Sequence, residues 1–110
     1  MTIDCIVQPT VSQGEIKTTG LSVAGRVTEV ALNAVTWTAL PPTALDGRNA
    51  ISIQNLSGAQ IKLNYDSTIA TYTGVVMNNE AERFYDITDS IVIYAKAQAG
   101  TPTITIEELS

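Results

Sequence analysis

The stretch of residues 40–65 limits most strongly what this chain can fold into. Pro41 and Pro42 favour an extended, non-helical path at its start. Asp46-Gly47 then gives a strong turn signal, because glycine accepts a positive φ angle without steric cost. Residues 50–54 follow with two isoleucines in alternate positions, which predicts a short strand that is apolar on one face. This part of the chain is therefore expected to be extended and rich in turns.

A second strand is expected directly after the first. Residues 55–58 are turn-forming, and residues 60–65 begin a new alternation with Ile61, Leu63 and Tyr65 on one side. Two short strands joined by such a turn are the pattern of a β-hairpin. We therefore predict that residues 50–54 and 60–65 pair with each other.

The rest of the chain repeats this pattern of short β-branched runs between turn signals. We expect further strands at residues 26–32, 35–40, 74–77, 83–87, 90–97 and 103–107. The first of these runs also fits helical spacing, but its valines and the lack of a cap favour a strand. The run at 90–97 shows no polar face before Lys96, which predicts a central strand covered on both sides. Residues 98–102 are expected to form a hairpin loop.

These strands predict an all-β fold, a small antiparallel β-sandwich or jelly-roll-like domain of about seven or eight short strands. A chain of 110 residues is long enough for one domain. Charged residues make up only 15% of it, which argues against disorder. Trp37 is expected to anchor the core or the contact between sheets, although a single tryptophan also suits an interface hot spot.

The N-terminal part is the least regular. We divide the chain into an extended N-terminal segment or arm (residues 1–25) and a β-sandwich domain (residues 26–110). The segment forms either a first strand and loop of the domain or an arm that pairs with a neighbouring subunit. Its apolar side chains need cover from this chain or another. The candidate interface residues are Ile3, Cys5, Ile6, Val7, Val11 and Ile16.

Cys5 is the only cysteine, so the chain cannot form an internal disulfide. We expect this side chain to act as a small buried or half-buried apolar group. An intermolecular disulfide is the alternative.

The charge balance argues against nucleic acid as a partner. The net charge is −5 and the isoelectric point is about 4.4. Phosphate binding needs clustered cations, whereas the six cationic residues are scattered singly. They are Lys17, Arg26, Arg48, Lys62, Arg83 and Lys96. We also expect no membrane partner, because no secretory signal is visible and no run reaches the roughly 20 apolar residues of a membrane span.

Several kinds of chemical site lack the residues that they need. The chain has no histidine and one cysteine, which removes histidine-dependent nucleophilic catalysis and a zinc site within one chain. A glycine-rich phosphate loop is also missing, so we expect no cofactor. The pairs Glu80/Glu82 and Asp86/Asp89 have the residue type for glycoside cleavage, and residues 86–89 offer oxygens to a calcium ion. Their turn-forming neighbours favour solvated turns, and Glu107-Glu108 is expected to form a solvated edge.

Residues 40–109 carry a recognisable order of strands and turns. It comprises a Leu-Pro start, a turn with Gly47-Arg48, an Ile-x-Ile-Gln-Asn strand at 51–55, a strand at 82–87, an Ile-Tyr-Ala … Gly-Thr pattern at 93–101 and a final strand. This order resembles small β-sandwich proteins from the structural gene clusters of tailed bacteriophages. It is a pattern of strands and turns and contains no catalytic signature.

The resemblance implies a non-enzymatic virion protein that is made in the host cytoplasm and binds the outer surface of the head as a decoration or cement protein. The implied partners are the major capsid protein and further copies of the chain, with a symmetric trimer as the first choice, because capsids offer threefold positions. One alternative is a head-fibre or tail-tip module that binds a host surface glycan or protein. The other is a glycan-cleaving domain that uses the carboxylates.

Overall fold

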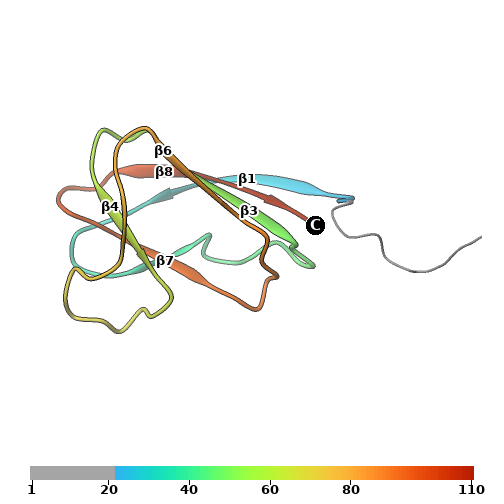
Figure 1. The fold of residues 1–110 in the computed structure, drawn as a ribbon, viewed down its shortest axis with the longest axis horizontal. Coiled ribbons are helices and arrows are strands. Elements are labelled where there is room, and N and C mark those ends of the chain that lie inside the picture. Colours follow the sequence, from blue (N-terminus) through green and yellow to red (C-terminus); the bar gives the residue numbers. More distant parts are fainter. Residues whose placement is uncertain (1–21) are drawn as a thin grey trace, which may run out of the picture.

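The computed structural model describes residues 22–110, and this part of the chain is all-β, as predicted, with eight strands and no helix. The strands are β1 (Gly25–Ala31), β2 (Thr38–Leu40), β3 (Ala50–Asn55), β4 (Ile61–Asn64), β5 (Val75–Met77), β6 (Ala81–Tyr85), β7 (Ile93–Ala97) and β8 (Thr103–Leu109). Figure 1 shows β1, β3, β6 and β8 on the upper side of the fold and β4 and β7 on the lower side.

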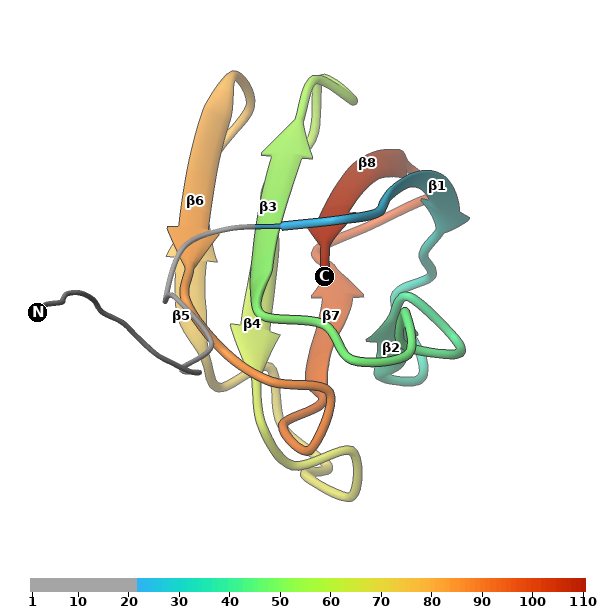
Figure 2. The ribbon, with the colours of Figure 1, turned by 90° about the vertical axis from the view of Figure 1, so that its right-hand side faces the viewer.

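The strands form two four-stranded antiparallel sheets that face each other (Figure 2). The first sheet has the order β1-β8-β3-β6 and the second the order β2-β7-β4-β5. Consecutive strands lie in opposite sheets at every step except β4 to β5. This alternation is the connectivity of a jelly roll, and it confirms the predicted small antiparallel sandwich.

The core lies between the sheets and follows from the two-residue period of the strands. In β3 and β8 the inward positions include four isoleucines, at 51, 53, 104 and 106, while Ser52, Thr105 and Glu107 point outward. Burying one such aliphatic side chain contributes about 1.5–3 kcal/mol. The buried cluster comprises Val30, Leu32, Leu40, Ile51, Ile53, Ile61, Leu63, Met77, Ile93, Ala95, Ala97, Ile104 and Ile106.

The predicted hairpin of residues 50–65 is wrong. β3 pairs with β6 and β8 in the first sheet, whereas β4 pairs with β5 and β7 in the second. Asn55 directs the crossing, because its buried Nδ2 donates to the carbonyl oxygens of Ala59 and Met77 at 2.8 and 3.1 Å. Its Oδ1 accepts a hydrogen bond from the Ser57 hydroxyl at 2.6 Å. Two strands whose apolar residues alternate with the same period can pair side by side in one sheet or lie in opposite sheets. Only the second arrangement lets the apolar face of each strand cover that of the other.

The predicted hairpin loop at residues 98–102 is also a crossing, since it joins β7 in the second sheet to β8 in the first. The central position of the strand before it is confirmed, because β7 lies between β2 and β4. The strand begins at Ile93, however, and Ile91 and Val92 before it are exposed.

The strand predicted at residues 35–40 is limited to β2, because Asn33 forms a side-chain turn ahead of it. Asn33 Oδ1 accepts hydrogen bonds from the backbone N–H groups of Val35 and Thr36 at 2.8 and 2.7 Å. Trp37 is buried, but not in the cluster between the sheets. Its Nε1 donates to the Ile69 carbonyl at 2.8 Å, and Lys96 Nζ lies 5.7 Å from its ring centre.

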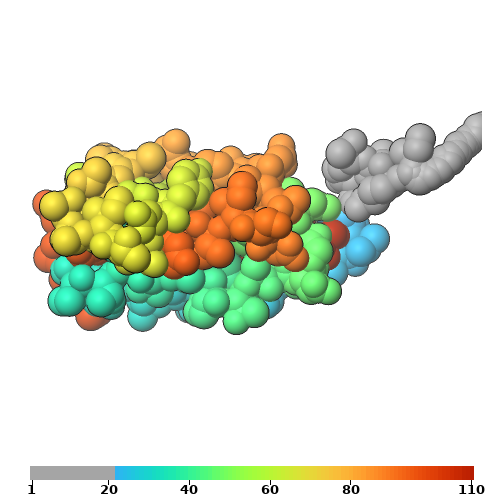
Figure 3. Space-filling model, turned by 90° about the horizontal axis from the view of Figure 1, so that it is seen from below, coloured from blue at the N-terminus to red at the C-terminus, as the bar shows by residue number. Residues whose placement is uncertain are grey.

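The β4–β5 loop, residues 65–74, folds back onto outward-facing side chains of the second sheet. Lys62 Nζ donates to the Tyr72 carbonyl at 3.0 Å and lies 4.6 Å from the Tyr72 ring centre. A Cβ on Gly74 would collide with the Leu63 carbonyl, so only glycine allows this close return. The loop forms the yellow surface in Figure 3.

Backbone pairing of the described part begins before residue 26. The N–H groups of Val23 and Ala24 donate to the carbonyl oxygen of Ser110, and the Ser110 N–H donates to Ala24. The candidate interface residues of the N-terminal segment lie outside the described residues; they are Ile3, Cys5, Ile6, Val7, Val11 and Ile16. Residues 22–110 contain no helix with the length and apolar character to cross a membrane.

Candidate functional site: a groove on the first sheet

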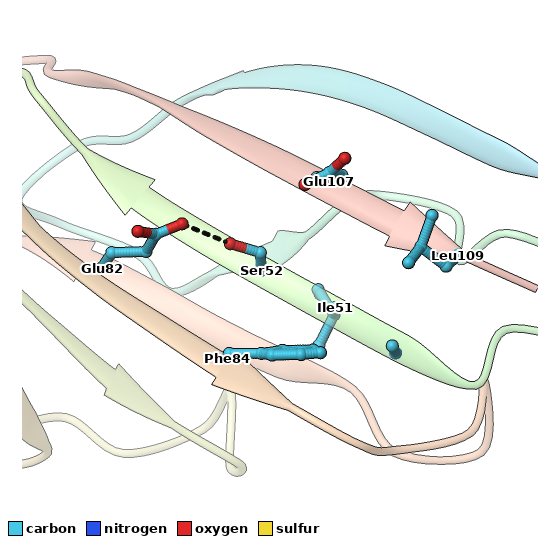
Figure 4. A pocket seen from close by; sticks show the side chains of 7 residues that line it. Ile51, Ser52, Glu82, Phe84, Glu107 and Leu109 are labelled. Carbon is cyan, nitrogen blue, oxygen red and sulfur yellow. Dashed lines mark hydrogen bonds between the residues drawn. The ribbon is translucent and has the colours of Figure 1, made fainter. Parts of the chain in front are cut away.

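A groove of about 480 Å³ runs along the outer face of the first sheet (Figure 4). Its floor is β3, where Ala50 and Ser52 point outward and are small. The strands on both sides carry larger outward side chains. The groove therefore arises because small residues on an inner strand lie between larger residues on its two neighbours.

The strand register places the groove walls. Ser52 lies opposite Phe84 of β6 and opposite Glu107 of β8. One step along, Ala50 lies opposite Leu109 of β8. The Ala50 end of the groove is thus apolar at Leu109, while Phe84 and Glu107 face each other across Ser52.

Glu82 adds a second carboxylate to the groove. The Ser52 hydroxyl donates to Glu82 Oε2 at 3.0 Å, which orients this carboxylate over the floor, as Figure 4 shows. An adjoining recess of about 260 Å³ extends the concave face past Gln54 and Thr105 to Val27 of β1. Phe84 and Val27 are 59% and 66% exposed, so this face offers apolar as well as acidic contacts.

The outer face of the first sheet carries no lysine or arginine from residues 22–110, because the five cations there are held elsewhere. Arg26 and Arg48 bind Glu108, and Lys62 and Lys96 belong to the second sheet. Arg83 shares the inward side of β6 with Tyr85 and donates to its hydroxyl at 2.9 Å. Within residues 22–110, the carboxylates of the groove therefore have no cation opposite them.

Beneath the apolar end of the groove lies a buried ionic cluster. Glu108 is fully buried, and its Oε1 accepts from Arg26 while its Oε2 accepts from Arg48 Nη1 at 3.0 Å and from the Leu45 N–H at 3.0 Å. Arg48 Nη2 also donates to the Ile91 carbonyl at 2.6 Å. The expected solvated edge at Glu107-Glu108 is thus wrong for Glu108, because β8 is an inner strand and adjacent residues point to opposite faces.

This cluster joins the 41–49 loop to the segment before β7. The Gly47 N–H adds a bond to Asp89 Oδ2 at 3.0 Å, and the Asn49 N–H donates to the Leu109 carbonyl at 2.8 Å. The start of β3, and with it the groove floor at Ala50, is therefore held by several independent contacts.

The four carboxylates considered for glycoside cleavage have separate surroundings. Glu82 lies in the groove, whereas Asp89 is bonded to Gly47 and Glu80 occupies a turn with a φ angle of 71°. Glu82 and Asp86 are four residues apart along an extended chain, which is about 13 Å, beyond the roughly 5–9.5 Å that glycosidase carboxylates span. Within the described part, no three Asp, Glu, Cys or His side chains are grouped to hold a metal ion.

Comparisons with models of protein families, with curated proteins and with solved structures found no match to this chain. The candidate site therefore rests on the geometry of the groove.

The sequence pattern singled out Glu82 as a candidate carboxylate and Glu107 as an edge residue, but it did not bring the groove residues together. The alternation at residues 82–87 and 103–107 places Glu82, Phe84 and Glu107 on one side of their own strands. Which strands are neighbours is the missing information, because β6, β3 and β8 are far apart in the chain.

Proposed function

We propose that this chain is a non-enzymatic structural protein of a bacteriophage virion, which binds the outer capsid surface as a decoration or cement protein. The mechanism is adhesive: a rigid sandwich makes contacts across the joints between capsomers and adds binding energy that resists internal DNA pressure. The major capsid protein is the partner, and copies of the chain associate as a symmetric oligomer, with a trimer as the first choice.

The observation that carries this proposal is the jelly-roll connectivity combined with a preformed, mixed apolar and acidic outer face. Jelly rolls are frequent in viral capsid proteins and lectins. The face around Phe84, Val27 and the two groove glutamates is rigidly supported and offers contacts to a partner. The resemblance of residues 40–109 to phage structural proteins adds the virion as the setting.

The N-terminal segment is the candidate for reaching a neighbouring subunit or the capsid. Deleting residues 1–12 should weaken cosedimentation with undecorated heads while the β-rich circular dichroism spectrum stays intact. The matched control is the full chain at the same concentration. Attachment that is unchanged by the deletion would exclude the arm, and no cosedimentation of the full chain would exclude the decoration role.

The groove also supports a second candidate, a fibre or tail module that binds a host surface glycan. The exposed ring of Phe84 offers an apolar surface for one face of a sugar ring. Ser52, Glu82 and Glu107 beside it offer oxygen atoms that can accept hydrogen bonds from the sugar hydroxyls. Binding of the purified chain to host cells, lost in Phe84→Ala, would favour this role. Binding to undecorated heads alone would favour decoration.

A further inference from the structure

The chain enters the fold beside the apolar end of the groove. The Ser22 hydroxyl donates to Asn49 Oδ1 at 3.2 Å, and Val23 and Ala24 are bonded to Ser110. Figure 2 shows this blue stretch passing from β1 across the end of β8 toward β3. Since Asn49 directly precedes Ala50, Ser22, the first described residue, lies next to the groove floor.

The groove carries two carboxylates, and the chain has one cation that the described residues do not account for. Five of the six lysine and arginine residues lie in residues 22–110, and each is held away from this face. The sixth is Lys17, five residues before Ser22. Opposite charges that approach within a few ångström attract each other, more strongly where water is partly excluded.

The spacing along the segment matches the spacing along the groove. In an extended chain, alternate residues share a side, so an extended path over residues 17–21 would put Leu21 and Lys17 on the same side. They are four residues apart, about 13 Å. The apolar floor at Ala50 and the polar floor at Gln54, beside Glu82, are also four residues apart on β3.

We propose that residues 17–21 of the same chain lie in this groove, with Leu21 against Phe84 and Leu109, and Lys17 against Glu82 and Glu107. Leu21 then covers apolar surface, and Lys17 neutralises the carboxylates. The docking gives the preceding residues a defined exit direction from the first sheet. It concerns the free protein, and a capsid or glycan partner that binds this face would displace the segment.

The peptide bond after Lys17 provides the test, because trypsin cleaves there and docking shields it. Cleavage of the full chain should be slower than cleavage of a synthetic peptide of residues 12–22. Glu82→Gln combined with Glu107→Gln should speed cleavage about three- to tenfold, since cleavage follows the population of the undocked form. Raised salt should have the same direction of effect.

Glu29→Gln is the matched control. Glu29 is an exposed glutamate on β1 that does not line the groove. Trypsin should therefore cleave the Glu29→Gln variant after Lys17 at the same rate as the unchanged protein. Circular dichroism should verify that all variants are folded. Phe84→Ala should speed cleavage through the apolar half of the contact.

Three outcomes would overturn the proposal. The full chain could be cleaved as fast as the free peptide, or the glutamine variants could leave the rate unchanged. Protection that rises with protein concentration, together with an oligomeric mass, would place the segment on a second copy instead. A concentration-independent rate supports docking within one chain, whatever the result with capsids.

Discussion

Glu107 and Glu108 are neighbours of the same type with opposite surroundings. Glu107 lines the open groove, while Glu108 is fully buried with Arg26 and Arg48 on its two oxygens. A buried carboxylate of this kind is tolerated only when its partners are in place. Substitutions at Glu107 and Glu108 therefore compare an exposed with a buried glutamate, and the difference in their free energies of unfolding measures the contribution of the ionic cluster.

Glu108→Gln should lower the free energy of unfolding by about 3–5 kcal/mol, because it leaves the buried Arg48 guanidinium without its counter-charge. Glu107→Gln should change it by less than about 0.5 kcal/mol, as expected for an exposed side chain. Denaturant unfolding of both variants tests this. Equal effects at the two positions would contradict the role assigned to the cluster.

Tyr72 gives the loop over the second sheet a dependence on pH. Burial raises the pKa of the Tyr72 hydroxyl above its ordinary value of 10.0. A raised pKa means that the folded state holds this proton more tightly. The stabilising contribution is therefore complete below pH 10 and is lost as the pH rises through the higher pKa of the folded state.

Tyr72→Phe keeps the ring over Lys62 but removes the titrating group. The difference in free energy of unfolding between the unchanged protein and this variant should shift in favour of the variant above about pH 10. The two proteins differ only in this hydroxyl, so the subtraction isolates the tyrosine. A difference that is constant with pH would show that the hydroxyl is not desolvated.

At the scale of the elements, the crossings between sheets determine the architecture. Six of the seven connections between consecutive strands change sheet, as the orders of the two sheets require. The crossing from β3 to β4 depends on Asn55, whose buried Nδ2 donates to the carbonyl oxygens of Ala59 and Met77 and whose Oδ1 accepts from the Ser57 hydroxyl. These hydrogen bonds take the place of the backbone hydrogen bonds that β3 and β4 would have formed with each other in a hairpin.

Asn55→Ala should lower the free energy of unfolding by about 2–3 kcal/mol, because it leaves buried carbonyl oxygens without donors. Asn79→Ala is the control, since Asn79 accepts only an exposed bond from the Gly58 N–H; a loss under about 1 kcal/mol is expected there. Thermal or denaturant unfolding measures both. A small loss at Asn55 would mean that the crossing is held by packing alone.

At the scale of the whole molecule, the two ends of the described chain close the first sheet. β8 pairs with β1 on one side and β3 on the other, and its inward side chains include Ile104, Ile106 and Glu108. The strand that comes last in the described chain is thus an inner strand of the first sheet, paired with β1 and β3.

Deleting residues 103–110 should abolish cooperative unfolding and the β-rich circular dichroism spectrum, because β1 loses its only ladder and the core loses two isoleucines. Deleting residues 1–12 should preserve both signals. A cooperative transition in the C-terminal truncation would show that the remaining strands form a core without β8.

Much of the local structure was predictable. Strands at residues 26–32, 50–54, 60–65 and 103–107 follow from alternation, which is a property of neighbouring residues alone. The turn at residues 33–37 was not predictable from alternation. It forms because the Asn33 side chain accepts hydrogen bonds from the backbone N–H groups of Val35 and Thr36. Glu108 was misread for a related reason, since its burial depends on Arg26 and Arg48 from distant parts of the chain.

Local sequence alone determined that residues 22–110 are all-β, where most of the strands lie and which side of β3, β4 and β8 is apolar. Those properties depend on backbone preferences and on side chains within a few residues of one another. Only the tertiary structure decided that successive strands cross between sheets, and that Ala50 and Ser52 lie between the larger side chains of β6 and β8. A two-residue period is identical for strands that pair and strands that face each other, so the choice rests on contacts between residues distant in the chain.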